Sequence, residues 1–598
     1  MKVFRIKNLL FFILLPAVIM YLFEAYTHNP FVRMKPGIQV LNIFLFIVIE
    51  IMLLFITGSL KTALRIMTVV FMLLGLGEYY LVEFRGVTLL PWDLGSLGTA
   101  AEFVGSYDYV PDIRAVFCIL GFIVVFVVCL FADLKLKDVG FFSKGSRSRQ
   151  ILLRIAAVLA SVFLIVLYTK FVQTDFARRT FGFYTKLFTP TAISERDGTL
   201  TAFLMELQYM NVEKPHGYND EEAEKALEAY KPVAPDKKAD IIVIMNEAFS
   251  DLSVLGEFKT DNDYMPFIHE LQSGACEDCL TGTLNVSIVG GNTPNTEFEF
   301  LTGNSLYFLP EGSIPYQQYV REGIYSMPAY LNEVGYTTVG MHPYYSEGWE
   351  RDRVYPELGF ERSLFLDDFD RNASLVRDYV SDMACSEQVI KEYEANLETG
   401  KPFFCFLVTM QNHSPYEKGF SNLPEDVKIE GGEGIDNIGT TERYLALIKR
   451  SDEAFRFLTD YFTDKEKPVV IVMFGDHQPS DSVVRPIWEL QGKDSRNLSE
   501  EDVDKRYMVP YVIWTNFDIE GGNGGDMSAN FLGNRVLDIA GAGKYPYRCF
   551  LDEVSEEYPV FSAVRAVDGN GNVQDDKTLK QSGLVKDYRN LQYHEMFH

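Results

Sequence analysis

The residues best suited to chemistry in this chain are an acid and a histidine that follow an apolar run. The run extends from Val469 to Phe474 and is followed by Gly475, Asp476 and His477. Such a run predicts a buried strand, whose carboxyl end presents the residues that come next. A carboxylate and an imidazole at that point are suited to bind one metal ion.

A second candidate is Thr293, which lies in the sequence Gly-Gly-Asn-Thr-Pro-Asn at 290–295. This sequence predicts a glycine-rich turn that enters a helix with proline at its first position. Thr293 is then either a simple helix cap or a hydroxyl at the positive end of a helix, where a phosphate is favoured. Coordination by a metal would lower the pKa of this hydroxyl and make it a nucleophile.

Other acids and imidazoles also follow apolar runs. The runs predict strands at 240–246, 336–341, 402–409, 468–474 and 510–515, and amphipathic stretches predict helices near 264–273, 325–334, 376–397 and 441–463. This alternation predicts a mostly parallel sheet with helices on both faces and a site at the carboxyl ends of its strands. Glu247, His342 and His413 follow three of these runs.

Two carboxylates, one imidazole and one hydroxyl form an oxygen and nitrogen ligand set. Such a set suits Mn²⁺, Mg²⁺ or Zn²⁺. The chain has only eight histidines, and four of them lie outside the predicted catalytic region. His269 lies inside a predicted amphipathic helix and is a poor ligand. We therefore predict a single divalent ion and not a two-metal site.

The first part of the chain is of a different class. Apolar stretches at 8–26, 39–60, 62–84, 114–134 and 151–172 are each about as long as a membrane span. Lys2, Arg5 and Lys7 precede the first stretch, and five basic residues lie between 135 and 149. This distribution predicts cytoplasmic loops at both places, and an odd number of spans then puts the chain beyond 172 outside the cell. We interpret the first stretch as an anchor and not as a cleaved signal.

The composition excludes one class of partner. The net charge of −27 is carried largely beyond residue 200, which argues against nucleic acid as a ligand. An anionic lipid would also need a metal or local cations to be held. Cys276 and Cys279 form a lone Cys-x-x-Cys pair, for which a local disulfide or two free thiols is favoured over zinc. The predicted domains are a five-helix transmembrane domain (1–172), a helical linker (173–235) and an extracellular α/β catalytic domain (236–598).

Several motifs together resemble one family. Glu247 after its strand, the sequence GGNTPNTEFEFLTG, His342 with the later Trp-Glu-Arg-Asp, Gln-Asn-His at 411–413 and Gly-Asp-His at 475–477 follow the order and spacing of the lipoteichoic acid synthase family. That family belongs to the alkaline phosphatase and sulfatase superfamily. The resemblance covers essentially the full chain and implies a multi-pass bacterial membrane protein with a sulfatase-like domain outside the cell.

The resemblance also implies an activity. Thr293 would take glycerol phosphate from phosphatidylglycerol and pass it to a glycolipid or polyglycerol-phosphate acceptor of the lipoteichoic acid type. The matching metal ligands are Glu247, Thr293, Asp476 and His477, with manganese as the usual ion. The positions that would hold the glycerol-phosphate group and assist proton transfer are His342, Trp349, Arg351 and His413.

Alternatives remain open at this stage. The chain has no Cys/Ser-x-Pro-x-Arg motif, so it lacks the sulfatase nucleophile. A phosphoethanolamine transferase or a lipid phosphodiesterase could use the same threonine, and a sensor with a degenerate pocket is a third reading. Tyr344, Gly348 and residues 478–480 depart from the pattern of better-known members, which leaves the headgroup less certain than the catalytic residues. The oligomeric state is not predicted.

Overall fold

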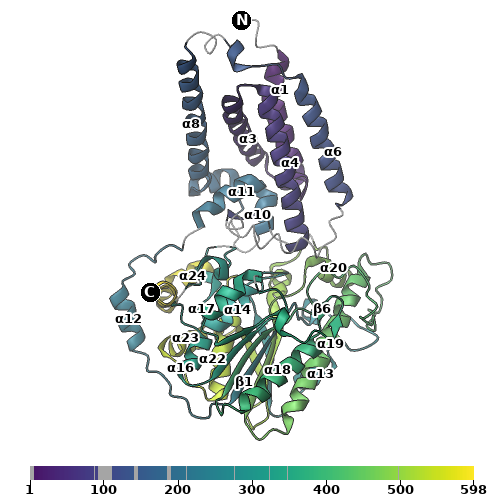
Figure 1. Cartoon of the computed structure of the whole chain (residues 1–598), viewed down its shortest axis with the longest axis vertical. Coiled ribbons are helices and arrows are strands. Elements are labelled where there is room, and N and C mark those ends of the chain that lie inside the picture. The colour runs from purple at the N-terminus through teal and green to yellow at the C-terminus, as the bar shows by residue number, and fades with distance from the viewer. Residues whose placement is uncertain are drawn as a thin grey trace. The chain divides into compact units, whose positions relative to one another are not determined.

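The computed structural model describes residues 6–598 except for 86–87, 92–110, 140–145, 185–189, 210–211 and the single residues 275, 311, 322, 347 and 496. The chain divides into two compact units, Met1–Asn211 (unit 1) and Val212–His598 (unit 2) (Figure 1). Each unit has its own core and is described by itself.

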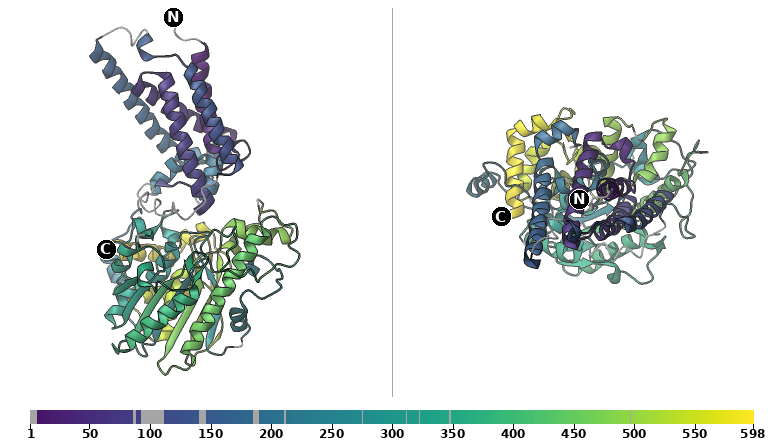
Figure 2. Two further views of the ribbon diagram at one scale, coloured as in Figure 1. Left: turned by 45° about the vertical axis from the view of Figure 1, so that its right-hand side comes forward. Right: turned by 90° about the horizontal axis from the view of Figure 1, so that it is seen from above.

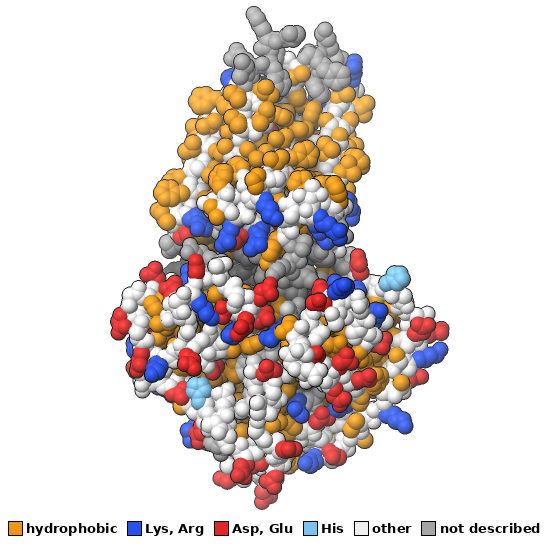
Figure 3. Space-filling model, turned by 180° about the vertical axis from the view of Figure 1, so that it is seen from behind, with side chains coloured by type: hydrophobic (Ala, Val, Ile, Leu, Met, Phe, Trp, Pro, Cys, Tyr) orange, Lys and Arg blue, Asp and Glu red, His pale blue; other side chains and the backbone are white. Residues whose placement is uncertain are grey.

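Unit 1 is built on long apolar helices. In the part of the chain that the structure describes, five helices are long and apolar enough to cross a membrane. They are α1 (Ile6–Glu24), α3 (Pro36–Thr57), α4 (Leu60–Arg85), α6 (Ile113–Val128) and α8 (Arg147–Val172). Their outward side chains are large and apolar, for example Leu73 and Phe163, and form the orange band in Figure 3. The five predicted spans are confirmed.

The predicted linker at 173–235 is divided between the two units. Helices α10 (Pro190–Asp197) and α11 (Thr199–Glu206) belong to unit 1, where the Asn42 amide donates to the carbonyl of Asp197 at 2.8 Å. The backbone N–H of Thr199 donates to the Glu24 carboxylate at 3.1 Å. Helix α12 (Asp220–Glu228) belongs to unit 2 and is capped by Asn219, whose side chain accepts from the N–H of Glu222.

Unit 2 contains the sheet that positions the site. Among the described residues, eight strands form it in the order β10-β2-β9-β8-β1-β7-β3-β4. Their bounds are β1 (Asp240–Asn246), β2 (Cys279–Asn285), β3 (Thr337–Met341), β4 (Arg362–Leu364), β7 (Phe403–Val408), β8 (Val469–Gly475), β9 (Met508–Thr515) and β10 (Gly522–Ser528). The five strands from β8 to β4 are all parallel.

Every residue of β1, β7 and β8 is buried, as expected for central strands covered on both faces. Helices α13 (Pro266–Gln272), α18 (Asp382–Leu397) and α19 (Ile438–Thr463) lie on one face. Helices α14 (Pro294–Thr302), α16 (Met327–Glu333), α22 (Ala529–Ala540) and α23 (Pro546–Glu557) lie on the other. Figures 1 and 2 show these two layers of helices around the strands.

The sheet differs from the simplest prediction at one side. The predicted strand at 510–515 forms as β9, but it runs antiparallel to β8 and to β2. Strands β2 and β10 lie beyond it, and neither was predicted. Both thiols of Cys276 and Cys279, the latter at the start of β2, are free. The mostly parallel α/β fold is confirmed, and the reversed strand β9 borders β8 at one side of the five parallel strands.

Candidate metal and nucleophile site

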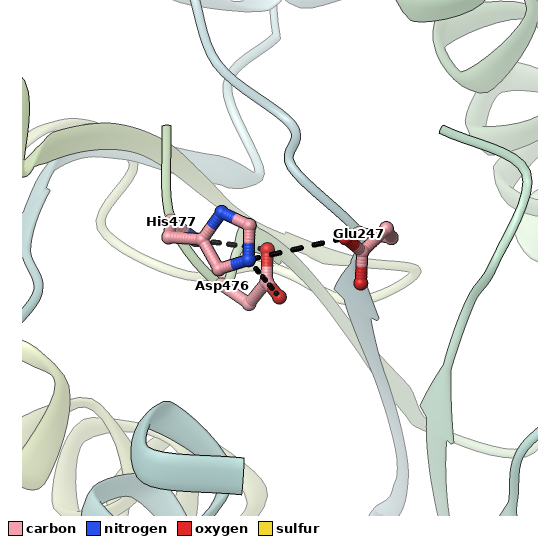
Figure 4. A group of neighbouring side chains, drawn as sticks. All are labelled: Glu247, Asp476 and His477. Carbon is pink, nitrogen blue, oxygen red and sulfur yellow. Dashed lines mark hydrogen bonds and ion pairs between the residues drawn. The ribbon is translucent and has the colours of Figure 1, made fainter. Parts of the chain in front are cut away.

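Glu247, Asp476 and His477 meet at the carboxyl ends of two neighbouring strands. Asn246 of β1 pairs with Gly475 of β8, so the next residue of each strand lies beside the other. The His477 Nε2 atom is 3.2 Å from Asp476 Oδ2 and 3.9 Å from Glu247 Oε1. Figure 4 shows the three side chains pointing toward one another. All three are buried, and we call them the acid–histidine cluster.

The backbone around Asp476 explains its orientation. A Cβ at Gly475 would lie 1.9 Å from the carbonyl oxygen of Phe249, so only glycine fits at this position. Ala248 has a φ of 49°, and its N–H donates to Asp476 Oδ1 at 2.7 Å. The N–H of His477 donates to the same oxygen at 2.8 Å. These two bonds fix the carboxylate and leave Oδ2 facing the cluster.

The histidine is held in one tautomer. Its Nδ1 lies 2.9 Å from the carbonyl of Gln478, which can only accept, so Nδ1 carries the hydrogen. Nε2 therefore presents a lone pair to the acids. His477 Nε2 and Asp476 Oδ2 are buried and have no hydrogen-bond partner among the described residues. Two unshared acceptors in contact repel each other unless a cation lies between them.

The charges of the cluster also favour a cation. Burial, and after it the neighbouring Asp476, raises the pKa of Glu247 well above its ordinary value, and burial raises the pKa of Asp476. No lysine or arginine in the described part of the chain forms an ion pair with either carboxylate. A divalent ion would offset this cost, and the oxygen and nitrogen donors suit Mn²⁺, Mg²⁺ or Zn²⁺. The residues therefore fit a single metal ion.

Thr293 directs its hydroxyl to this cluster and not to its own helix. The hydroxyl donates to Glu247 Oε2 at 3.3 Å and makes no capping hydrogen bond to α14. The predicted glycine turn and first-position proline of α14 are confirmed. Asn292 has a φ of 64°, and the N–H of Gly290 donates to the carbonyl of Gln478 at 2.9 Å. The simple-cap interpretation of Thr293 is wrong, because its side chain does not cap.

Arg351 is buried and is not a surface cation. Its Nε donates to Glu297 Oε1 at 3.2 Å, and its Nη2 lies 2.5 Å from the same oxygen. Tyr355 and Tyr316 donate to Glu297 Oε2 at 2.9 and 3.2 Å. We call these four residues the arginine cluster. Its carboxylate and its guanidinium neutralise each other, in contrast to the acid–histidine cluster.

His342 and His413 each have Nδ1 beside a backbone carbonyl, and no hydrogen bond joins either Nε2 to another of the described residues. The Nδ1 of His342 donates to the carbonyl of Val408 at 3.0 Å, and the Nδ1 of His413 donates to that of Ser414 at 2.8 Å. Burial, and after it the Arg351 cation, lowers the pKa of His342 well below its usual value. Burial is the main cause that lowers the pKa of His413 to about 4, and the Arg377 charge adds to this effect. Their lowered pKa values keep both rings neutral near pH 7, with Nε2 as the ring atom that can accept a proton.

Trp349 lies two residues before Arg351, on a turn with unusual backbone. Trp349 and Glu350 have φ values of 59° and 57°, in the left-handed region that non-glycine residues rarely adopt. Trp349 is half-buried and Gly348 is buried. The carbonyl of Gly348 accepts from Arg351 Nη1 at 3.3 Å, which ties the turn to the arginine cluster.

Two groups of supporting residues were not predicted. Arg377 is buried and donates to the carbonyls of Gln411, His413 and Pro415, which holds the segment that carries His413. Asn246, Asp382, Asn412 and Ser451 form a buried hydrogen-bonded network behind the ends of β1 and β7. For Glu297 a signal existed, because it lies four residues after Thr293 and hence on the same helix face. For Arg377 the sequence offers no local signal.

Comparisons with known proteins agree with this fold and site. Residues 239–542 match the sulfatase family model. The fold and the acid–histidine cluster define a member of the alkaline phosphatase superfamily. Because the match covers half of its length, the chain belongs to the sulfatase family. The resemblance stated from the motifs is confirmed.

Two similar proteins give further detail. A Rhizobium meliloti protein named for the modification of cyclic β-1,2-glucan is 32% identical over 408 residues, which are 67% of this chain and 62% of that protein. The lipoteichoic acid synthase of Staphylococcus aureus is 28% identical over 338 residues, 53% of this chain and 49% of that enzyme. The match thus spans about half to three fifths of these relatives.

The structural likeness extends to a solved transferase. The structure of Streptococcus pyogenes phosphoglycerol transferase GacH in complex with sn-glycerol-1-phosphate has a TM-score of 0.50 and 21% identity. The likeness covers 64% of this chain and 94% of that one. At this identity it establishes a shared fold.

Proposed function

We propose that the chain is a membrane-anchored, metal-dependent phosphoglycerol transferase. One observation carries the proposal: the Thr293 hydroxyl lies 3.3 Å from Glu247 at a buried cluster whose facing atoms on Asp476 and His477 have no partner among the described residues. A hydroxyl beside such a cluster suits covalent transfer of a phosphoryl group. The names of the relatives, a lipoteichoic acid synthase and a phosphoglycerol transferase, support the same substrate class.

Four residues would hold the ion: Glu247, Thr293, Asp476 and His477. When bound, a divalent ion, with Mn²⁺ as our first choice, would lower the pKa of the Thr293 hydroxyl and stabilise charge on a phosphoryl oxygen. Each residue has a fixed orientation before any ligand arrives. Asp476 is held by two backbone N–H groups, and His477 by the carbonyl of Gln478.

The proposed reaction has two displacements. First, Thr293 Oγ1 gives up its proton as it attacks the phosphorus of phosphatidylglycerol, the bond from phosphorus to the diacylglycerol oxygen breaks, and that oxygen takes up one proton. The glycerol phosphate is then bound to Thr293. Second, a hydroxyl of the acceptor attacks this phosphorus and loses its proton, and Thr293 regains its hydrogen as the Thr293–phosphorus bond breaks. The acceptor leaves longer by one glycerol phosphate.

His413 is the residue to which we assign these proton transfers. In its neutral form it accepts the proton of the acceptor hydroxyl at Nε2 in the second displacement. For the first displacement it must be protonated, and the negative charge of a bound phosphate would raise its low pKa toward that state. His342, Trp349 and Arg351 would hold the glycerol-phosphate group. Arg351 keeps N–H hydrogens beyond those that Glu297 and Gly348 accept.

The proposed location is the outer side of a bacterial cell membrane. The five apolar helices of unit 1 support anchoring in a membrane, and the basic loops of the sequence favour unit 2 outside the cell. There the enzyme would meet phosphatidylglycerol of the outer leaflet and a glycolipid or polyglycerol-phosphate acceptor.

The test uses purified full-length protein with Mn²⁺ and fluorescent phosphatidylglycerol. We expect release of diacylglycerol and, when no acceptor is present, a glycerol-phosphate adduct on Thr293 detected by mass spectrometry of its peptide. Thr293→Ala should abolish both. Thr302→Ala is the matched control, because it makes the same change in the same helix, where the hydroxyl bonds only within α14 and its cap. Equal turnover by Thr293→Ala would overturn the proposal.

Assays with other substrates separate the related activities. Phosphatidylethanolamine in place of phosphatidylglycerol tests a phosphoethanolamine transferase, and release of glycerol phosphate into water with no acceptor product indicates a phosphodiesterase. Because one relative is named for glucan modification, a cyclic β-glucan should be compared with polyglycerol phosphate as the acceptor.

A further inference from the structure

Unit 1 contains a basic pocket of its own, whereas the acid–histidine cluster belongs to unit 2. The pocket has a volume of 390 Å³ and opens between the start of α3 and the chain around residue 183. Three of its lining residues are cations: Arg33, Lys35 and Arg196. Val32, Ile38 and Phe183 supply apolar walls. A pocket with cations and apolar walls together fits an amphiphilic anion.

The cations are only partly neutralised by acids. Arg33 Nε lies 3.4 Å from Glu195 Oε2. The Lys35 amine donates to the carbonyl of Gly182 at 2.8 Å, and the Arg196 guanidinium lies 4.3 Å over the ring of Tyr184. Within the described residues, no ion pair joins Lys35 or Arg196 to a carboxylate. Asp197 is buried and accepts from the N–H of Tyr184. The pocket therefore keeps a positive balance.

The pocket lies at the boundary of the apolar band. Helix α2 (Pro30–Arg33) follows α1, and α3 starts at Pro36, so the pocket is at the end of two spans. Phe31, Val32 and Val40, which are 69%, 76% and 66% exposed, present apolar side chains beside the cations. Figure 3 shows Lys and Arg side chains gathered along one edge of the orange band. A phosphate at the pocket would thus have its acyl chains beside apolar surface.

We propose that this basic pocket binds the phosphate of an anionic phospholipid, whose acyl chains lie against the apolar surface around Phe31 and Val40. A soluble phosphate would satisfy the cations but would leave the apolar walls without a partner. The strong net negative charge of the chain makes such locally gathered cations necessary for an anionic lipid. This inference does not rest on the reaction proposed for Thr293.

The experiment is native mass spectrometry of the full-length protein titrated with dioleoyl phosphatidylglycerol or dioleoyl phosphatidylcholine. All proteins carry Thr293→Ala, so that the lipid is not turned over. We expect one phosphatidylglycerol to bind in preference to phosphatidylcholine. The triple variant Arg33→Gln/Lys35→Gln/Arg196→Gln should bind it at least about tenfold more weakly. Excess inorganic phosphate should not displace it.

The matched control is Lys137→Gln/Arg147→Gln/Arg149→Gln, which removes the same charge from exposed positions outside the pocket and should retain the lipid. A lipid bound in unit 2 would be present in both triple variants, so their difference reports the pocket. Should the pocket triple variant fail to fold, Arg196→Gln alone, at an exposed residue, should still weaken binding. Equal binding by the two triple variants, equal binding of phosphatidylcholine, or displacement by inorganic phosphate would each overturn the inference.

Discussion

Two buried acid clusters of unit 2 differ in how their charges are met. In the arginine cluster, Glu297 receives hydrogen bonds from Arg351, Tyr316 and Tyr355. In the acid–histidine cluster, Asp476 Oδ2 and His477 Nε2 face each other at 3.2 Å without a hydrogen between them. The first cluster is complete within the chain. The second presents donor atoms that could hold a metal ion, and this is the basis of the proposed metal site.

The largest expected effect comes from Asp476→Asn. Removal of this charge should abolish bound metal and lower turnover by on the order of a thousandfold, because the ion would lose one of its carboxylates. Metal content by inductively coupled plasma mass spectrometry and diacylglycerol release measure the two effects. Asp460→Asn, an exposed change in α19, is the control. EDTA should lower the unfolding midpoint of the wild type and leave that of Asp476→Asn unchanged; the same shift in both would argue against the site.

Glu297→Gln tests the other side of the comparison. It leaves Arg351 as a buried cation without its acid, which should lower the free energy of unfolding of unit 2 by about 3–5 kcal/mol. The bound metal should remain, because Glu297 is not one of its ligands. Denaturant unfolding and metal content are the measurements, with the exposed Glu556→Gln as control. A loss of metal with little loss of stability would contradict the division into two clusters.

Glu299, in the same helix α14 as Glu297, offers a test through the pH dependence of stability. Burial raises its pKa to about 7. A carboxyl whose folded pKa lies above its unfolded pKa contributes stability that is full below about pH 4.5 and is lost as the pH rises through about 7. The loss should be on the order of 3 kcal/mol. Unfolding across this range should show it in the wild type, and Glu299→Gln should lack it; parallel curves would refute the assignment.

The smallest effect is expected at His269. This histidine lies near the surface and is already paired with acids of the chain. Its Nδ1 lies 2.9 Å from Asp263, and the hydrogen bond with Asp251 is the main cause that raises its pKa to about 9. The stability that the protonated His269 contributes to the fold is full below about pH 6.5 and is lost as the pH rises through about 9. Because the side chain is 32% exposed, we expect less than about 1 kcal/mol. His269→Gln should remove this alkaline slope, and an unchanged slope would contradict the pairing.

Much of the fold could be predicted because its central strands are simple in composition. The runs that form β1, β7 and β8 are apolar except for Asp240 and Asn246 at the ends of β1, as burial on both faces requires. Strands β2 and β10, with sequences CLTGTLN and GNGGDMS, have weak strand propensity and form through their neighbours. A Cβ at Gly282 would meet the carbonyl of Gly525 at 2.3 Å, so here glycine permits the pairing. No local pattern shows such a requirement.

The site, like the fold, has features that could be predicted from the sequence and features that could not. Glu247, Asp476 and His477 could be predicted because strand ends of a parallel sheet converge at one edge. The roles of Thr293, His342, Trp349, Arg351 and His413 in a reaction stay predictions. The partners of these residues could not be predicted, since Glu297 and Arg351, or Arg377 and the carbonyl of His413, are brought together only by the folded chain. The tautomers of His342 and His413 depend on carbonyls whose positions the sequence does not contain.

The most direct test of the central claim is anomalous X-ray diffraction from crystals grown with Mn²⁺. The account predicts one strong peak about 2.0–2.3 Å from Asp476 Oδ2, His477 Nε2, a Glu247 oxygen and Thr293 Oγ1. No peak should occur in the arginine cluster. A structure with no ion between these atoms, or with Thr293 turned away from it, would contradict the account.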